Sequence, residues 1–129
     1  MTKKILLVED DADSAKLLEF KLKSLGYDVA VAQDGLEGID SARQLHPDLI
    51  ILDVVMPRMD GFTASRLLRY DHRLAETPVV FLTCCSRESD IVRGFESGGD
   101  VFLNKPVDLS ELARGVEQLI GPPEGKDEK

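Results

Sequence analysis

Short apolar runs recur along the chain and predict buried strands. The clearest run, Leu49–Leu52, has four consecutive apolar residues and leads directly into Asp53. An uninterrupted run of this kind is typical of a strand buried on both faces, as in the middle of a parallel sheet. Similar runs predict strands over residues 5–8, 27–32, 78–83 and 101–103. Because the run over 27–32 is more polar, we expect that strand near an edge of the sheet.

Amphipathic helices are predicted between the strands, because apolar residues there recur every three or four positions. In the first helix, Asp13 or Ser14 is the expected N-cap, and Gly26 is the expected left-handed residue at its end. The predicted helices cover residues 13–25, 36–45, 62–70, 86–97 and 108–120.

This alternation of strands and helices predicts one α/β domain over residues 3–120. Short connections favour a doubly wound, five-stranded parallel sheet with the flavodoxin-like (βα)5 order 2-1-3-4-5. Residues 121–129 are polar and rich in Pro and Gly, so we expect a disordered tail or the start of a linker there. The sequence leaves open whether the domain stands alone or was cut from a longer protein.

The predicted strand order brings acidic side chains together. Glu9 and Asp10 follow the first strand, and Asp53 ends the third, which is its neighbour in this order. Ligands of open α/β sheets bind at the carboxyl ends of the strands, where the strand order reverses. The sequence therefore predicts a site in which three carboxylates converge.

Charge and hydropathy narrow the classes of function. The formal net charge of −8 argues against binding to nucleic acids or to anionic membranes. No apolar run approaches the roughly 20 residues of a membrane span, and the run before Glu9 is too short for a signal peptide, so we expect a cytoplasmic protein. The adjacent Cys84 and Cys85 form neither a disulfide framework nor a CxxC site, and we expect reduced thiols.

The converging residues suit phosphoryl chemistry. Clustered carboxylates repel one another unless a cation or shared protons intervene, and an all-oxygen site favours Mg²⁺, with Mn²⁺ as a substitute. Thr83 and Lys105 end the last two strands and add a hydroxyl and a mobile positive charge. Such a site can receive a phosphoryl group, with Asp53 attacking in line.

Five motifs in register resemble the receiver domain of two-component response regulators over residues 3–120. They are Val8-Glu9-Asp10-Asp11, Leu52-Asp53-Val54-Val55-Met56-Pro57, Asp60-Gly61, Leu82-Thr83 and Lys105-Pro106. The resemblance implies that Asp53 accepts a phosphoryl group from a sensor histidine kinase or a histidine phosphotransfer protein. It also implies that the domain catalyses this step and a slow dephosphorylation, as a signalling switch rather than a metabolic enzyme.

The resemblance assigns further roles. Asp10, Asp53 and the backbone carbonyl of Val55 would bind Mg²⁺ directly, and Glu9 would assist through water. Thr83 and Lys105 would bond phosphoryl oxygens, Phe102 would be the switch aromatic, and Pro106 would follow a cis peptide bond. Phosphorylation would then alter an output surface over residues 86–97, 101–103 and 108–120, and the expected state is a monomer that dimerises when phosphorylated.

Three positions depart from the usual family pattern and bear on the lifetime of the phosphorylated state. Cys84 follows Thr83 where a smaller residue is usual, and its thiol narrows access to the acyl phosphate. Val55 and Cys85 lie two residues beyond Asp53 and Thr83, where polar side chains can orient an attacking water. An apolar pair cannot, so we expect slow self-hydrolysis.

The sequence also allows other interpretations of function. The main alternative is a pseudo-receiver that binds partners without phosphorylation, which is disfavoured because no expected site residue is missing. A phosphatase using an aspartyl phosphate would carry a second acid at Val55, and flavin binding is disfavoured by the acids after the first strand. His46 and His72 lack metal-ligand spacing, so the donor histidine is expected on another protein.

Overall fold

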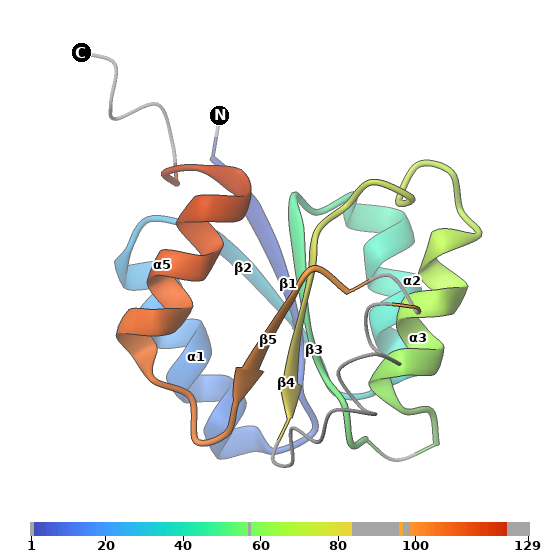
Figure 1. Ribbon diagram of the computed structural model, residues 1–129, viewed down its shortest axis with the longest axis horizontal. Helices are drawn as coiled ribbons and strands as arrows, with labels where there is room; N and C mark the ends of the chain where they lie inside the picture. Colours follow the sequence, from blue (N-terminus) through green and yellow to red (C-terminus); the bar gives the residue numbers. More distant parts are fainter. Residues whose placement is uncertain (1, 57, 84–95, 97–98, 124–129) are drawn as a thin grey trace.

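The computed structural model describes residues 2–56, 58–83, 96 and 99–123 (Figure 1). Its strands are β1 (Lys4–Val8), β2 (Asp28–Ala32), β3 (Leu49–Asp53), β4 (Val79–Thr83) and β5 (Val101–Asn104). Its helices are α1 (Ala12–Ser24), α2 (Gly35–Leu45), α3 (Gly61–Arg69) and α5 (Leu109–Ile120). The predicted helix over 86–97, Pro57, both cysteines and residues 124–129 lie outside the described residues.

The predicted sheet is confirmed. Five parallel strands pair in the order β2-β1-β3-β4-β5, so β2 lies at an edge, as its more polar sequence predicts. The pairing sets Val8 beside Leu52 and Asp53 beside Leu82. The carboxyl ends of all five strands therefore meet at one end of the sheet (Figure 1).

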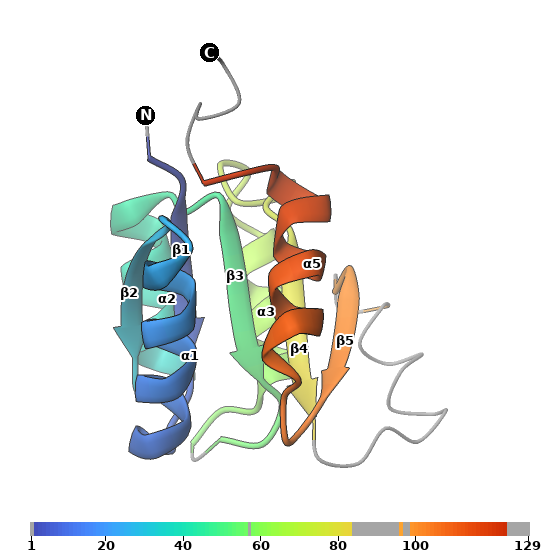
Figure 2. The ribbon, with the colours of Figure 1, turned by 90° about the vertical axis from the view of Figure 1, so that its left-hand side faces the viewer.

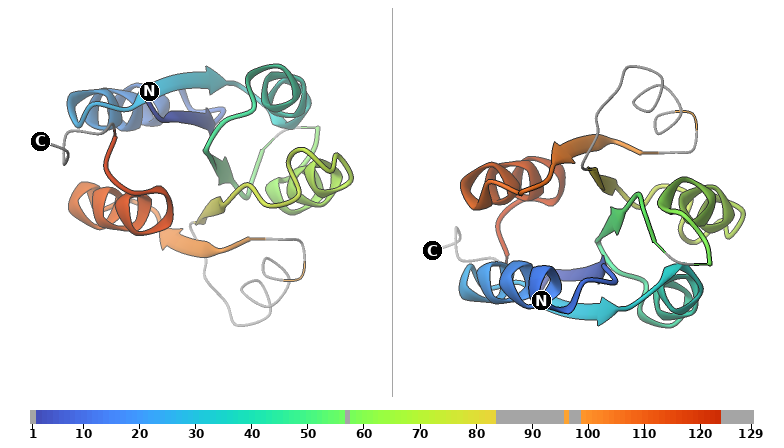
Figure 3. Two further views of the ribbon diagram at one scale, coloured as in Figure 1. Left: turned by 90° about the horizontal axis from the view of Figure 1, so that it is seen from above. Right: turned by 90° about the horizontal axis from the view of Figure 1, so that it is seen from below.

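Two apolar layers flank the sheet, because alternate residues of each buried strand point to opposite faces. Leu7 and Ile51 pack beneath α1 and α5, whereas Leu6 and Ile50 pack beneath α2 and α3. Figure 2 shows α1 and α5 in front of the sheet, and Figure 3 shows the two helix pairs on either side of it. Because β3 is buried along its whole length, Asp53 lies at the end of a fully packed strand.

One predicted helix cap is wrong. Asp11, not Asp13 or Ser14, caps α1: its backbone is extended, and its carboxylate accepts the N–H groups of both predicted residues at 3.0 and 3.5 Å. The helix consequently begins at Ala12, one residue earlier than predicted. Gly26 does adopt a positive φ of 107°, as expected just after the helix.

The two ends of the described chain meet at the end of the sheet opposite the carboxyl ends of the strands (Figures 1 and 2). The Lys3 backbone N–H donates to the Pro123 carbonyl at 2.9 Å, and the Tyr27 hydroxyl donates to the Gly121 carbonyl at 2.9 Å. Residues 121–123 therefore pack onto the fold. Among the described helices, none has the length and hydropathy of a membrane span.

A close contact between α2 and β1 makes Gly38 sensitive to substitution. A Cβ added at Gly38 would lie 2.8 Å from a methyl carbon of buried Val8. We predict that Gly38→Ala lowers the free energy of unfolding by about 1–3 kcal/mol, because neither β1 nor α2 can move without disturbing the core. Urea denaturation followed by circular dichroism measures this change.

Gly115 in α5 is the matched control, because a Cβ there would meet nothing within 4 Å. Gly115→Ala is expected to raise the free energy of unfolding by about 0.5–1 kcal/mol through helix propensity alone. Equal stability of the two variants would contradict the account of helix packing.

Candidate functional site

The three predicted acids meet at the carboxyl ends of β1 and β3. Glu9 and Asp10 follow β1, and Asp53 is the last residue of β3, which pairs directly with β1. One carboxylate oxygen from each of the three lies within 4.8 Å of the other two. Glu9 and Asp53 are buried, whereas Asp10 is exposed. The cluster is therefore open to solvent on one side.

Lys105 supplies the positive charge at this cluster. Its Nζ donates to Asp53 Oδ2 at 3.0 Å and also lies 3.0 Å from Glu9 Oε1. Its backbone N–H donates to the Thr83 carbonyl at 2.8 Å, and its peptide bond to Pro106 is cis. Burial lowers the pKa of Lys105, but Asp53 and Glu9 together outweigh this effect and leave it above its ordinary value. The ammonium group is thus held charged against both acids.

Glu9 is the buried member with unused bonding capacity. Its Oε2 accepts the Asp11 backbone N–H at 3.1 Å, whereas Oε1 makes no hydrogen bond within the described residues, since Lys105 approaches it outside hydrogen-bonding geometry. Burial, and then the neighbouring Asp53 carboxylate, raise the pKa of Glu9 to about 7. The salt bridge from Lys105 offsets part of the cost of burying this carboxylate, and a proton or a divalent cation would offset more.

These residues fit a hard divalent cation. All three donors are carboxylates, the buried Glu9 Oε1 is unbonded within the described chain, and exposed Asp10 leaves room for water ligands. Mg²⁺ prefers oxygen ligands and retains several waters, so this donor set suits it better than a soft metal.

Thr83 and Phe102 lie on the neighbouring strands. Thr83 ends β4 and is buried, and Phe102 is half-buried on β5. The Phe102 ring packs against Phe81 with centroids 5.3 Å apart. The structure thus brings Thr83 to the same end of the sheet as Lys105 and places Phe102 on β5, beside β4, while Cys84 and Cys85 lie outside the described residues.

The segment between β3 and α3 contacts Asp53, the candidate phosphoacceptor, through its backbone. The Val55 backbone N–H donates to Asp53 Oδ1 at 3.3 Å, and Val55 as a residue is 66% exposed. Gly61 lies so close to the end of β3 that an added Cβ would overlap the Asp53 carbonyl oxygen. Asp60-Gly61 is one of the five sequence motifs, but the motif alone does not predict this close approach; the position of a glycine directly after a helix-capping acid is a signal that could have suggested it.

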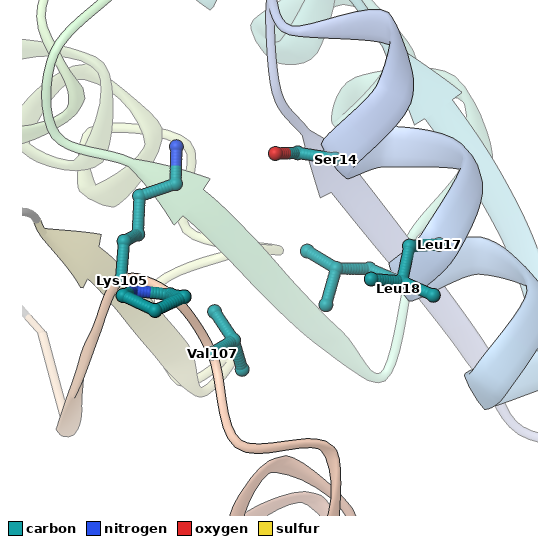
Figure 4. A pocket seen from close by; sticks show the side chains of 6 residues that line it. Ser14, Leu17, Leu18, Lys105 and Val107 are labelled. Atoms are coloured by element: carbon teal, nitrogen blue, oxygen red, sulfur yellow. The ribbon is translucent and has the colours of Figure 1, made fainter.

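A cavity of about 140 Å³ adjoins the cluster between α1 and the segment after β5 (Figure 4). Figure 4 shows Lys105 and Val107 on one side and Leu17 and Leu18 of α1 on the other. Its other lining residues are Ser14 and Pro106. The ammonium group of Lys105 thus contacts the acids, while the aliphatic part of its side chain lines this mainly apolar cavity.

Comparison with known proteins agrees with this geometry. The family profile for the response regulator receiver domain matches residues 5–117. The DNA-binding dual master transcriptional regulator RpaA of Synechocystis is 43% identical over 117 residues, which cover 91% of this chain and 48% of RpaA. The chain thus spans about half the length of that relative.

Solved structures show the same fold. The chemotaxis protein CheY4 of Vibrio cholerae superposes with a TM-score of 0.89 at 28% identity, covering 92% of this chain and 99% of CheY4. The receiver domain of the sensor histidine kinase PA1611 from Pseudomonas aeruginosa, solved with magnesium in its active site cleft, gives 0.87 at 32% identity, covering 94% and 99%. With the matched profile spanning nearly all of the described fold, this chain belongs to the response regulator receiver domain family.

Proposed function

We propose that this receiver domain accepts a phosphoryl group on Asp53 from a phosphohistidine of a partner kinase or phosphotransfer protein. The observation that carries the proposal is the 3.0 Å hydrogen bond from Lys105 Nζ to Asp53 Oδ2, inside an acidic cluster with metal-binding capacity. This bond places a carboxylate that can act as a nucleophile beside an ammonium group that can pair with the oxygens of the incoming phosphoryl group. Membership of a family that serves two-component systems supports the same donor chemistry.

The transfer requires one bond to form and one to break. A carboxylate oxygen of Asp53 attacks phosphorus in line, while the N–P bond breaks and its electron pair returns to the donor imidazole. Lys105 then pairs with a phosphoryl oxygen, and the Thr83 hydroxyl donates to another. Bound Mg²⁺, held by Glu9, Asp10, Asp53 and the Val55 carbonyl, would supply charge neutralisation for the phosphoryl group.

The switch follows from the new charge at the end of β3. A phosphoryl group adds about −1.5 to −2 charge and three acceptor oxygens, which draw Thr83 and the following segment inward. Phe102 on β5 packs against Phe81 of β4, so a shift at Thr83 can reach it through packed rings. The proposed output surface comprises residues 86–97, β5 and α5, and phosphorylation would promote dimerisation through it.

The pseudo-receiver alternative has less support. A phosphorylation-independent module would have no need for the Glu9, Asp10, Asp53 cluster with Lys105 bonded to it. RpaA is named as a DNA-binding regulator, but this chain covers only about half of the length of RpaA. The proposed output of the present protein is therefore an interaction with a partner protein or with a linked domain. We place its action in the cytoplasm, where the kinases of such systems present their phosphohistidines.

Phosphorylation by a small phosphodonor tests the central step. We predict that the intact chain gains one phosphoryl mass in the presence of Mg²⁺, and that neither chelator-treated protein nor Asp53→Asn gains it. Asp71→Asn is the matched control, because Asp71 lies after α3 and pairs with Arg73 away from the cluster. Equal labelling of Asp53→Asn and wild type, measured by mass spectrometry, would contradict the assignment.

The phosphorylated state is expected to persist for minutes or longer, because exposed Val55 cannot orient a hydrolytic water and neither can Cys85. Introducing polar residues at both positions, as in Val55→Asn with Cys85→Asn, should shorten the lifetime. Decay of the phosphoryl mass after donor removal measures it. A wild-type half-life of seconds would overturn this expectation.

Magnesium affinity should depend on the protonation of Glu9. Its pKa is raised to about 7, and a carboxyl must lose its proton to serve a cation, so protons compete with the metal below that pH. We predict about tenfold tighter Mg²⁺ binding at pH 8 than at pH 6, as the deprotonated fraction rises through the pKa. Calorimetric titration of Glu9→Gln should show weaker binding and a flatter pH profile, and an unchanged profile would exclude Glu9 as the titrating group.

A further inference from the structure

Asp34 joins two segments that the sequence keeps far apart. It caps α2, where its Oδ1 accepts the Glu37 backbone N–H at 2.9 Å. Its Oδ2 accepts a hydrogen bond from Nη2 of Arg58, which lies in the segment between β3 and α3. A single buried carboxylate therefore fixes the start of α2 and binds the segment that follows the phosphoacceptor candidate.

The segment is shaped for this contact. Arg58 has a φ of 70°, a left-handed conformation that a residue other than glycine rarely adopts without support. The next residue, Met59, packs against Gly35, where an added Cβ would lie 3.1 Å from the Met59 Cβ and 3.1 Å from its carbonyl oxygen. Consecutive residues thus meet in register, Asp34 with Arg58 and Gly35 with Met59.

The same segment contacts the Asp53 carboxylate. The Val55 N–H donates to Asp53 Oδ1, and the Gly61 N–H donates to the Val54 carbonyl at 2.9 Å. These bonds tie the segment to its own strand and helix, whereas the Asp34–Arg58 pair ties it to the neighbouring α2. If the pair is lost, the backbone around Val55 gains freedom and the Asp53 carboxylate loses a fixed donor.

We propose that Asp34, through Arg58, is a positioning residue that holds the β3–α3 segment in the conformation competent to bind the metal ion and receive the phosphoryl group. This inference rests on the magnesium site of the proposed function. Asp34 and Arg58 act through Val55 and touch neither the metal nor the reacting atoms.

The Asp34–Arg58 ion pair is suited to fixing the local conformation of the β3–α3 segment rather than to raising the free energy of unfolding of the whole domain. The Arg58 side chain is 68% exposed and that of Asp34 is 12% exposed, and pairs with one such exposed member contribute little to folding. The Glu37 backbone N–H, and then the charge of Arg58, keep the pKa of Asp34 below its ordinary value, so it stays ionised near neutral pH. Removing the pair should therefore affect the site more than the fold.

A double-mutant cycle on the full chain tests the inference. Asn retains helix-capping ability, so Asp34→Asn removes the charge while keeping the cap of α2. We expect Asp34→Asn and Arg58→Ala each to weaken Mg²⁺ binding about tenfold, as losses of supporting residues around metal sites do. The double variant should bind no more weakly than either single variant. Isothermal titration calorimetry measures the affinities, and urea denaturation should show all three variants near wild-type stability.

Asp71 and Arg73 provide a matched control pair, with their ion pair at 3.0 Å and exposures of 13% and 53%. Asp71→Asn and Arg73→Ala should leave Mg²⁺ affinity unchanged. Arg58→Gly adds a second check, because glycine tolerates the left-handed φ but cannot bond Asp34. It should fold well and still bind Mg²⁺ weakly.

A readout without metal separates this inference from the proposed function. In metal-free protein, the Val55 amide should exchange faster with solvent in Arg58→Ala than in wild type or Arg73→Ala, measured by NMR. Wild-type Mg²⁺ affinity in the Asp34 and Arg58 variants, or additive losses in the double variant, would overturn the positioning role. Failure of the wild-type chain to bind Mg²⁺ would contradict the proposed metal site, and unchanged Val55 exchange would then overturn the positioning role as well.

Discussion

The site depends on one half-buried ammonium group placed between two buried carboxylates. Lys105 Nζ lies 3.0 Å from both Asp53 Oδ2 and Glu9 Oε1, in a region where like charges would otherwise repel strongly. Charges so close can be held in a folded domain only when they are paired. The third acid, Asp10, gives the cluster more negative than positive charge. This excess makes the cluster suited to a divalent cation.

The fold turns this electrostatic arrangement into a directed site. Parallel strands deliver Glu9, Asp53, Thr83 and Lys105 to the same end of the sheet, and Asp53, the proposed phosphoacceptor, ends the fully buried strand β3. Close backbone approaches at Gly61 and Gly35 then let the β3–α3 segment pack against Asp53 and α2. Residues on the segment could thereby influence the proposed metal site and the proposed phosphoacceptor without touching either.

The sequence predicts the sheet, its strand order and the meeting of the acids, because uninterrupted apolar runs and strand-end charges are local signals. It does not predict that Asp11 caps α1, since Asp11, Asp13 and Ser14 offer similar capping chemistry within four residues. Nor does it predict the Asp34–Arg58 bond, which depends on how segments far apart in the sequence meet in space. The raised pKa of Glu9 likewise depends on its burial and on the neighbouring Asp53 carboxylate, which only the folded chain brings together.

The most direct test of the account identifies the atom that carries the phosphoryl group. Borohydride reduces an acyl phosphate to an alcohol, so treatment of the phosphorylated chain would convert the modified aspartate to homoserine, which peptide mass spectrometry locates. The account predicts homoserine at position 53 alone. Homoserine at position 10 or at any other aspartate in place of 53, or a stable phosphoryl group that resists reduction, would contradict it.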